Sequence, residues 1–295
     1  MIINNKFKSF RMGFNYKLAE EIVSCFNHTD PSEIIDSLTY LECSTSEGII
    51  QDVFKENIGA ILKPDKHTLL HSFCEKYLYY YLMNEQWFLL DEICDDFDAN
   101  SIIQYIKHTA DILNEYKVVT RDYTHEISSF DEKYKESGYE LEHEFKELVR
   151  EIYDEMLACF DEIEDAIIEA TFYLLYDNKE FLFKFNSYLS RFTTNIYLPN
   201  NCFDESNHIK RTQYIPEWLK RAVFYRDRGR CQHCGKDLSG QLTIADDREL
   251  QFDHIIPLEN GGTNDATNFQ LLCNRCNSEK GGQLCFPNYL YQMYW

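Results

Sequence analysis

Apolar residues recur at intervals of three and four along much of the first 200 or so residues, the spacing of one helix face. This stripe is clearest from about 139 to 176, where acidic residues fill the opposite face. We predict one long helix there. Further helices are expected at about 16–27, 31–41, 48–62, 66–96 with a break near Asn84, and 100–117 with Asp98 or Asn100 as the cap. The pattern at 118–137 is ambiguous between a loop and short strands.

The pattern changes after about residue 193. Residues 193–214 contain Pro199, several asparagines and little apolar periodicity, as in a linker. Seven of the eleven glycines follow residue 228, which indicates a domain with tighter turns. The elements expected there are a helix from Pro216 to about Arg226, strands at Leu250–Ile256 and Phe269–Leu272, a Gly261-Gly262 turn and a helix at Asn274–Lys280.

The predicted fold is therefore mainly α, with a small α/β domain at its C-terminus. We expect a helical domain over 1–200, a linker over 201–214 and a second domain over 215–295.

Charge follows the same division. The whole chain carries a net charge of −21, but residues 206–295 hold 11 basic and 10 acidic residues. The acidic excess lies in the first domain, which would repel a polyanion, whereas residues 206–230 carry a net charge of +5. No apolar run is long enough to span a membrane and no signal peptide is apparent, so we expect a cytoplasmic protein without a membrane partner.

Two Cys-x-x-Cys pairs, Cys231/Cys234 and Cys273/Cys276, are the strongest chemical signal. In a reducing compartment such pairs are typical of metal ligands, and four thiolates complete a tetrahedral zinc site. The 38-residue gap between the pairs exceeds that of a common zinc ribbon, so a functional segment is expected within it. His233 lies inside the first pair and is expected beside the zinc rather than on it.

The segment between the pairs contains Asp253, His254 and Asn268. Asp and Asn offer the oxygen ligands that Mg²⁺ or Mn²⁺ prefers, and a histidine next to such a metal suits a general base. Because neighbouring residues of a strand face opposite sides, we expect the strand to end or bend at these positions. The competing interpretation is an ordinary buried histidine in a hairpin.

The order of these motifs resembles the zinc-stapled HNH endonucleases over about 212–283. It runs Cys-x-x-Cys, Asp-His-Ile-Ile-Pro-Leu, Gly-Gly and Asn-Phe-Gln-Leu-Leu-Cys-x-x-Cys-Asn. The resemblance implies a ββα-metal fold in its H-N-N variant. His254 would be the general base, Asp253 and Asn277 the ligands of a catalytic Mg²⁺ or Mn²⁺, and Asn268 the residue that ties down the catalytic loop.

The same resemblance implies an enzyme that hydrolyses phosphodiester bonds, in DNA rather than RNA. Basic residues near the motifs are expected to contact phosphates, namely Arg226, Arg228, Arg230, Arg275 and Lys280. One module carries one active site, so we expect it to nick a strand. A regulated nuclease of antiviral defence or of a mobile element, restrained by residues 1–200, is one hypothesis.

Two other classes of function stay open. The chain could be a non-catalytic zinc protein that binds nucleic acid, or an interaction scaffold built on the acidic helices. The helical domain and the aromatic C-terminus at 286–295 are the expected surfaces for a protein partner or a second copy of the chain.

Overall fold

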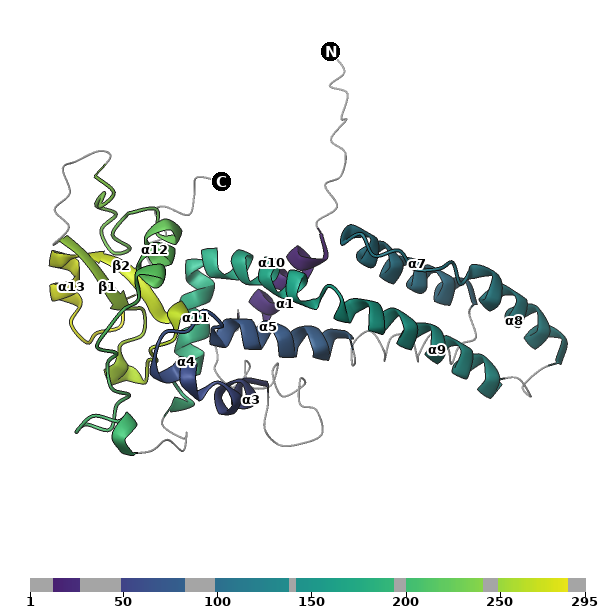
Figure 1. The fold of residues 1–295 in the computed structure, drawn as a ribbon, viewed down its shortest axis with the longest axis horizontal. Coiled ribbons are helices and arrows are strands. Elements are labelled where there is room, and N and C mark those ends of the chain that lie inside the picture. Colours follow the sequence, from purple (N-terminus) through teal and green to yellow (C-terminus); the bar gives the residue numbers. More distant parts are fainter. Residues whose placement is uncertain are drawn as a thin grey trace, which may run out of the picture. The chain divides into compact units, whose positions relative to one another are not determined.

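The computed structural model describes residues 13–26, 49–82, 99–137, 142–193, 200–240 and 249–285. These segments are mainly helical, with one small sheet near the C-terminus (Figure 1). The earlier helices are α1 (Phe14–Cys25), α3 (Ile49–Glu56), α4 (Ile58–Leu62), α5 (Leu69–Tyr80), α7 (Ala99–Glu115), α8 (Thr124–Ser137), α9 (Glu142–Asp161), α10 (Glu164–Asp177) and α11 (Lys179–Leu189). The later elements are α12 (Glu217–Arg226), β1 (Leu250–His254), β2 (Phe269–Cys273) and α13 (Asn274–Lys280).

The helices α1 and α7 lie close to their predicted positions, and the mainly helical fold class is confirmed. The helix expected at 48–62 is present as two, α3 and α4, which meet at Asn57. The helix expected at 31–41, the break near Asn84 and the Asp98 cap lie outside the described residues.

The prediction of one helix from about 139 to 176 was wrong. The segment forms α9 and α10, separated by a turn at Glu162 and Ile163. Acidic residues explain the position of the break. The last turn of α9 has no basic residue to offset its negative end, whereas Glu164 and Asp165 lie in the first turn of α10, where the helix dipole favours them.

The segment 118–137 is neither a loop nor a pair of strands, because most of it forms α8. The carboxylate of Asp122 accepts a hydrogen bond from the Thr124 N–H at 2.8 Å and so helps to begin the helix. The helix α11 was not predicted. It begins after Asn178, whose side chain accepts a hydrogen bond from the Phe181 N–H at 3.0 Å.

The chain packs as two compact units, each made of segments that are distant in sequence. The first draws its described residues from 13–18 and 77–171, and the second from 19–76 and 172–285. Units of packing need not be units of function. The functional boundaries at 200 and 214 stay a prediction.

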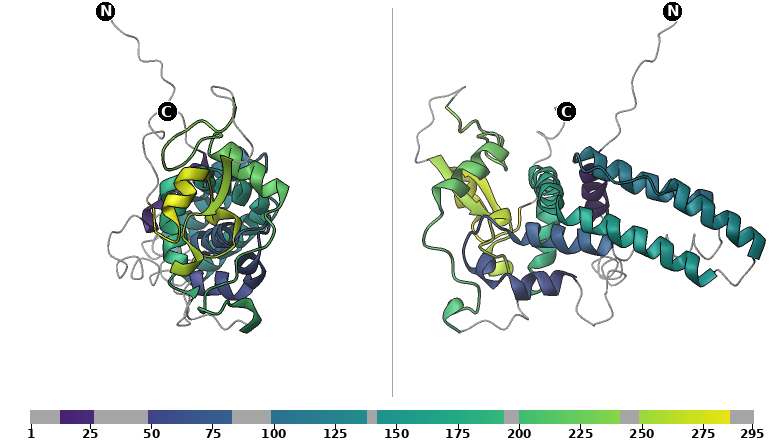
Figure 2. Two further views of the ribbon diagram at one scale, coloured as in Figure 1. Left: turned by 90° about the vertical axis from the view of Figure 1, so that its left-hand side faces the viewer. Right: turned by 45° about the vertical axis from the view of Figure 1, so that its right-hand side comes forward.

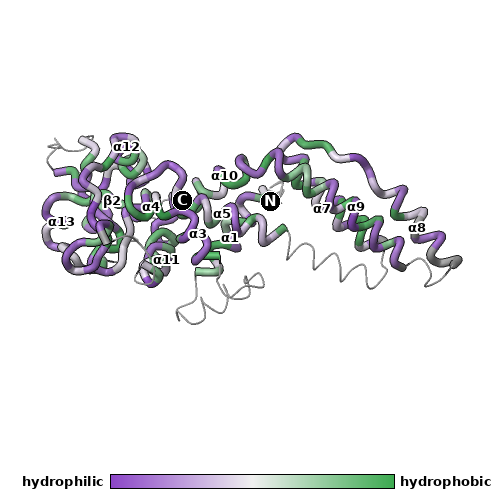
Figure 3. Tube along the Cα trace, turned by 60° about the horizontal axis from the view of Figure 1, so that its bottom comes forward, coloured by the Kyte–Doolittle hydropathy of each residue, from purple (hydrophilic) through white to green (hydrophobic). Residues whose placement is uncertain are grey.

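The first unit is built on α7, α8 and α9, which pack against one another. Each of these helices alternates hydrophobic and hydrophilic residues along its length (Figure 3). Phe14, Tyr105, Tyr153 and Phe160 are buried in this unit. It therefore has an aromatic core of its own.

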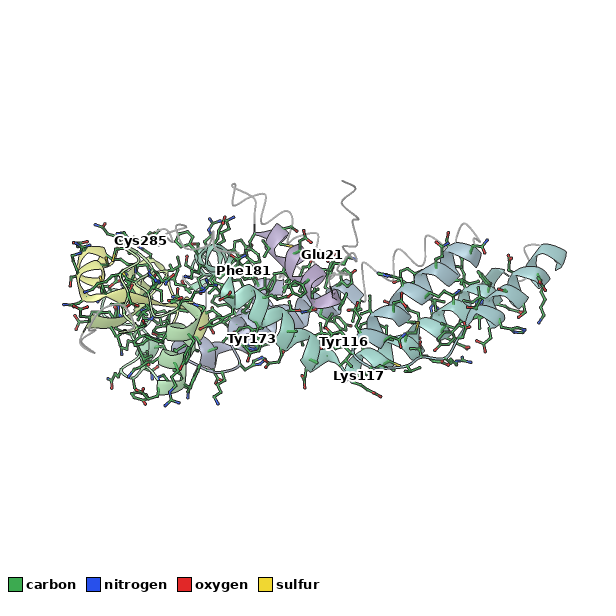
Figure 4. All side chains as sticks on the ribbon, turned by 90° about the horizontal axis from the view of Figure 1, so that it is seen from above. Glu21, Tyr116, Lys117, Tyr173, Phe181 and Cys285 are labelled. Carbon is green, nitrogen blue, oxygen red and sulfur yellow. The ribbon has the colours of Figure 1, made fainter. Side chains whose placement is uncertain are left out.

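The helical part of the second unit is held by a cluster of aromatic rings. Phe26 makes edge contacts with Phe73, Phe181 and Phe185, with ring centroids 5.4 to 5.7 Å apart. Figure 4 labels Phe181 in α11. The cluster joins the end of α1, the middle of α5 and α11 into one packed body.

The sheet of the second unit is an antiparallel pair, β1 with β2, in which Leu250 pairs with Cys273 and His254 with Phe269. The helix α13 packs on both strands and α12 packs on β2 (Figure 2). Leu219, Val223 and Leu271 are fully buried between them. None of the described helices is long and apolar enough to cross a membrane.

Candidate active site

The four cysteines of the two Cys-x-x-Cys pairs converge. Their sulfur atoms all lie within 4.8 Å of one another, and the sulfurs of Cys234 and Cys273 are 3.9 Å apart. Four sulfurs bound to a tetrahedral zinc ion at about 2.3 Å stand about 3.8 Å from each other. Gly235, with a φ of 72°, donates its N–H to the Cys231 carbonyl at 2.8 Å and closes the first turn. The cluster therefore fits zinc.

A buried ion pair fastens α12 to the sheet. Arg226 binds both carboxylate oxygens of Asp227, at 2.8 and 3.1 Å, and donates to the Phe269 carbonyl at 2.6 Å. Asp227 also accepts the Leu271 N–H at 2.7 Å, and the guanidinium lies over the Tyr176 ring. Since these groups are almost fully buried, their pairing fixes the position of β2.

His254 is the last residue of β1, so the strand ends at the position where the sequence predicted an end or a bend. Its side chain is buried, and the ring lies 4.5 Å from that of Phe269. Burial lowers the pKa of His254 to about 3. The charges of Arg211 and Lys280 act in the same direction, and a hydrogen bond to Asn264 opposes them. The imidazole is therefore neutral at neutral pH.

The hydrogen bonds of Asn264 determine which His254 nitrogen carries the proton. The amide nitrogen of Asn264 donates to the carbonyls of Leu62 and Lys210, at 3.1 and 2.8 Å. Its oxygen accepts the Thr212 N–H at 3.1 Å and faces His254 Nε2 at 3.2 Å. Because this amide cannot be turned round without losing three bonds, Nε2 must be the donor. The buried Nδ1 keeps its lone pair and has no partner among the described residues.

Asn268 holds the loop that follows β1. Its side-chain oxygen accepts the Ile256 N–H at 2.8 Å, and its amide nitrogen donates to the carbonyls of Ile256 and Thr263 at 3.0 and 2.8 Å. Its main-chain carbonyl accepts the Ile255 N–H at 2.6 Å. Asn268 thus closes the loop from both ends, directly beside His254.

Asp253 and Asn277, the expected metal ligands, lie on elements that pack together. Asp253 is in β1 and Asn277 is in α13, one turn before Lys280. Lys280 donates to an Asp253 carboxylate oxygen at 2.6 Å and to the His254 carbonyl at 2.7 Å. The face of α13 that carries Lys280 therefore lies on Asp253, and Asn277 belongs near that face.

Comparison with known families identifies this segment. Residues 231–283 match the model of the HNH endonuclease family. These residues form an HNH endonuclease domain. It contains the four-cysteine cluster that could hold zinc, and no family matches the rest of the chain. No curated protein and no solved structure matches the chain.

The structure corrects two of the expected phosphate contacts. The side chains of Arg226 and Lys280 are each only 3% exposed and are bound by Asp227 and Asp253. They hold the HNH domain together and do not present a charge at its surface. Arg228 and Arg275 are exposed, and Arg230 is half-buried with a bond of 3.4 Å to the Gly235 carbonyl. Their contact with phosphates stays a prediction.

His233 is not a member of the four-cysteine cluster found among the described residues, and its Nδ1 is 2.9 Å from the sulfur of Cys285. Figure 4 labels Cys285, which follows α13.

Sequence reasoning missed the residues that connect the HNH domain to the helices. Asp265 accepts the Leu69 N–H at the start of α5 at 3.0 Å, and Asn264 donates its N–H to the Ile61 carbonyl at 2.9 Å. The Thr267 hydroxyl lies 3.4 Å from the side-chain oxygen of Asn186 in α11. The only sequence signal was the Asn-Asp pair after Gly-Gly-Thr, which is typical of a turn and says nothing of a partner.

Proposed function

We propose that the chain is a metal-dependent endonuclease that hydrolyses phosphodiester bonds in DNA. The observation that carries this proposal is the state of His254, which is neutral and buried, with Nε2 held by Asn264 and the Nδ1 lone pair unpartnered among the described residues. A neutral imidazole with an open lone pair can accept a proton. Asp253 lies next to it in sequence and Asn268 ties the following loop.

In the proposed reaction, Nδ1 of His254 takes a proton from the attacking water. The bond from Nε2 to Asn264 keeps the ring from turning and keeps the second proton away from Nδ1. Phe269 packs against one side of the ring and limits its movement further. These contacts orient the base before the nucleic acid binds.

Asp253 and Asn277 would hold the catalytic metal. They offer one carboxylate and one amide oxygen, donors that suit Mg²⁺ or Mn²⁺, with water and phosphate oxygens to complete the shell. When bound, such an ion stabilises the negative charge that develops on the phosphate and on the leaving oxygen. Lys280 holds Asp253 in place through its bond of 2.6 Å, so the carboxylate is already oriented.

The test is a plasmid-nicking assay with Mg²⁺, with Mn²⁺ and with EDTA. We expect EDTA to stop cleavage and His254→Ala to lower the rate about 10²- to 10⁴-fold, the usual contribution of a general base. His125→Ala is the matched control, because His125 is an exposed histidine of α8. Cleavage that persists in EDTA, or that His254→Ala leaves unchanged, would show that the proposal is wrong. RNA of the same sequence tests the preference for DNA.

One observation favours the alternative of a non-catalytic nucleic-acid-binding protein. The buried ammonium group of Lys280 pairs with Asp253, and its positive charge disfavours a second cation at this carboxylate. In that case the chain would bind DNA with equal affinity in Mg²⁺ and in EDTA and would not nick it. A role in defence, and the restraint of the nuclease by residues 1–200, stay predictions.

A further inference from the structure

A short segment before the HNH domain is fixed next to the catalytic histidine. Ile209 is buried and bridges to Phe203, and the Lys210 N–H donates to the Cys202 carbonyl at 2.9 Å. Asn264 then binds this segment twice, through the carbonyl of Lys210 and the N–H of Thr212. The residue between those two anchors is Arg211.

The side chain of Asn264 also binds His254, so one residue positions both Arg211 and the proposed base. The Asn264 oxygen that accepts the Thr212 N–H at 3.1 Å is the one that faces His254 Nε2 at 3.2 Å. The backbone on either side of Arg211 is therefore linked to the imidazole through one amide group. This linkage fixes the backbone of Arg211 relative to the imidazole.

The guanidinium of Arg211 is available for a ligand. The residue is exposed, and it makes no hydrogen bond or ion pair with any residue that the structure describes. Arg226 and Lys280, by contrast, are bound by carboxylates.

We propose that Arg211 binds the scissile phosphate beside His254 and holds it in line with the water that this histidine activates. A guanidinium can bind two phosphate oxygens at once, which fixes orientation as well as position. The surrounding sequence fits an anionic ligand, since residues 206–230 carry a net charge of +5. The proposal rests on the proposed nuclease function and adds a residue outside the segment that matches the HNH family.

The experiment uses the full-length, zinc-loaded protein with three substitutions, Arg211→Gln, Arg211→Lys and Arg221→Gln. Arg221→Gln is the matched control, because it makes the same Arg-to-Gln change at an exposed residue of α12 outside the anchored segment. Cleavage is measured with Mg²⁺. Binding of a fluorescent DNA duplex is measured over a series of salt concentrations in a His254→Ala background, which separates binding from cleavage.

We expect Arg211→Gln to lower the cleavage rate on the order of 100-fold, as for other lost contacts to transition-state charge. The slope of log affinity against log salt should become shallower by about 1, the contribution of one phosphate contact. Arg211→Lys should lie between this variant and the wild type. Arg221→Gln should cleave within about twofold of the wild type, with an unchanged slope.

The results separate this proposal from the nuclease proposal. If the wild type cleaves DNA and Arg211→Gln cleaves equally well with the same salt slope, the role of Arg211 is wrong and the nuclease stands. Equal losses in Arg211→Gln and Arg221→Gln would reveal only general charge attraction and would also overturn it. The wild type could also bind DNA without cleaving it. If in that case only Arg211→Gln shows a shallower salt dependence of binding, the phosphate contact stands without hydrolysis.

Discussion

Single buried polar residues determine the geometry of the candidate site. Asn264 uses its amide group and its main-chain N–H to reach the end of α4, the segment before α12 and the imidazole of His254. A buried amide with all its bonds made adds rigidity, because any displacement leaves a polar group without a partner. The site is therefore defined by a residue that was not among its predicted chemical groups.

His71 does the same for the start of α5. The ring Nδ1 of His71 accepts the Thr68 main-chain N–H at 3.1 Å. The main-chain N–H of His71 donates to the Thr68 hydroxyl at 3.3 Å. This is a capping box in which histidine replaces the usual Glu or Gln. The ring stacks on Phe172 at 3.7 Å, and burial together with the charge of His67 lowers its pKa to about 4.

We predict that this histidine makes the protein less stable in mild acid. Its pKa is about 4 when folded and about 6.5 when unfolded, so between these values the unfolded chain binds more protons. The free energy of unfolding must then fall as pH drops from 6.5 towards 4, by up to about 2 kcal/mol at pH 5. Urea unfolding at pH 7 and pH 5 measures the loss.

His71→Gln is the control for this prediction. Glutamine can accept the same Thr68 N–H but does not titrate in this range, so the variant should lose less stability between pH 7 and pH 5. Equal losses in the wild type and the variant would mean that His71 is not responsible. His254, whose pKa is also low, contributes equally to both proteins.

At the scale of elements, the turn after β1 depends on two glycines for a steric reason. Gly261 has a φ of 80°, and a side chain there would overlap the Ser190 carbonyl at the end of α11. A Cβ on Gly262 would overlap the carbonyl of Ile256. The Gly261-Gly262 turn expected from sequence is therefore required both by its own conformation and by the close approach of neighbouring backbone.

We predict opposite effects for two glycine-to-alanine substitutions. Gly262→Ala must displace the backbone at Ile256, which Asn268 also holds, and should cost more than 3 kcal/mol of stability. Gly59→Ala, at an exposed position of α4, meets no atom within 4 Å and should add about 0.5 to 1 kcal/mol. Thermal unfolding of both variants is the measurement. A destabilised Gly59→Ala, or a Gly262→Ala as stable as the wild type, would contradict this explanation.

The sequence predicted the elements whose signals are local. The helix after Pro216, the Cys-x-x-Cys turns and the strand that ends at His254 follow from spacing and turn residues close together in the chain. The break between α9 and α10 was missed because apolar periodicity runs through it, while the charges that explain it act at helix ends.

The sequence predicted only those parts of the site that have a local signal. Residue types and their order indicated His254 and Asn268. Arg226 was expected at the surface, because its burial in the fold has no local signal in the sequence. The bonds from Asn264 to Leu62 and from Asp265 to Leu69 join positions about 200 residues apart, which no local pattern encodes.

At the scale of the whole molecule, the HNH domain is part of a larger packed unit. Its loop between β1 and β2 is bonded to the end of α4, to the start of α5 and to Thr193 just after α11. A fragment limited to residues 200–295 would lose all these partners and leave buried polar groups unsatisfied. Poor activity of such a fragment would therefore say nothing about whether the acidic helices restrain the nuclease.

A better test of restraint removes residues 77–171, which make up most of the first unit, and keeps residues 1–18. The deletion leaves two chain ends, at Lys76 and at Phe172. The rings of His71 and Phe172 lie 3.7 Å apart, and the five helical residues from His71 to Lys76 span only about 7.5 Å, so these ends are close. We predict that a Gly-Ser linker of about eight residues in place of 77–171 preserves folding and metal-dependent nicking. The HNH contacts with α4, α5 and α11 are all kept.

The rate of this linked protein then decides the role of the first unit. A rate above that of the full-length chain would show restraint, because the second unit with its HNH domain is kept and only residues 77–171 are gone. A rate within about threefold would assign α7, α8 and α9 to another task, such as partner binding. If the linked protein does not fold, while the full-length chain with an equal linker inserted after Lys117 does, the second unit is not self-sufficient and the division fails.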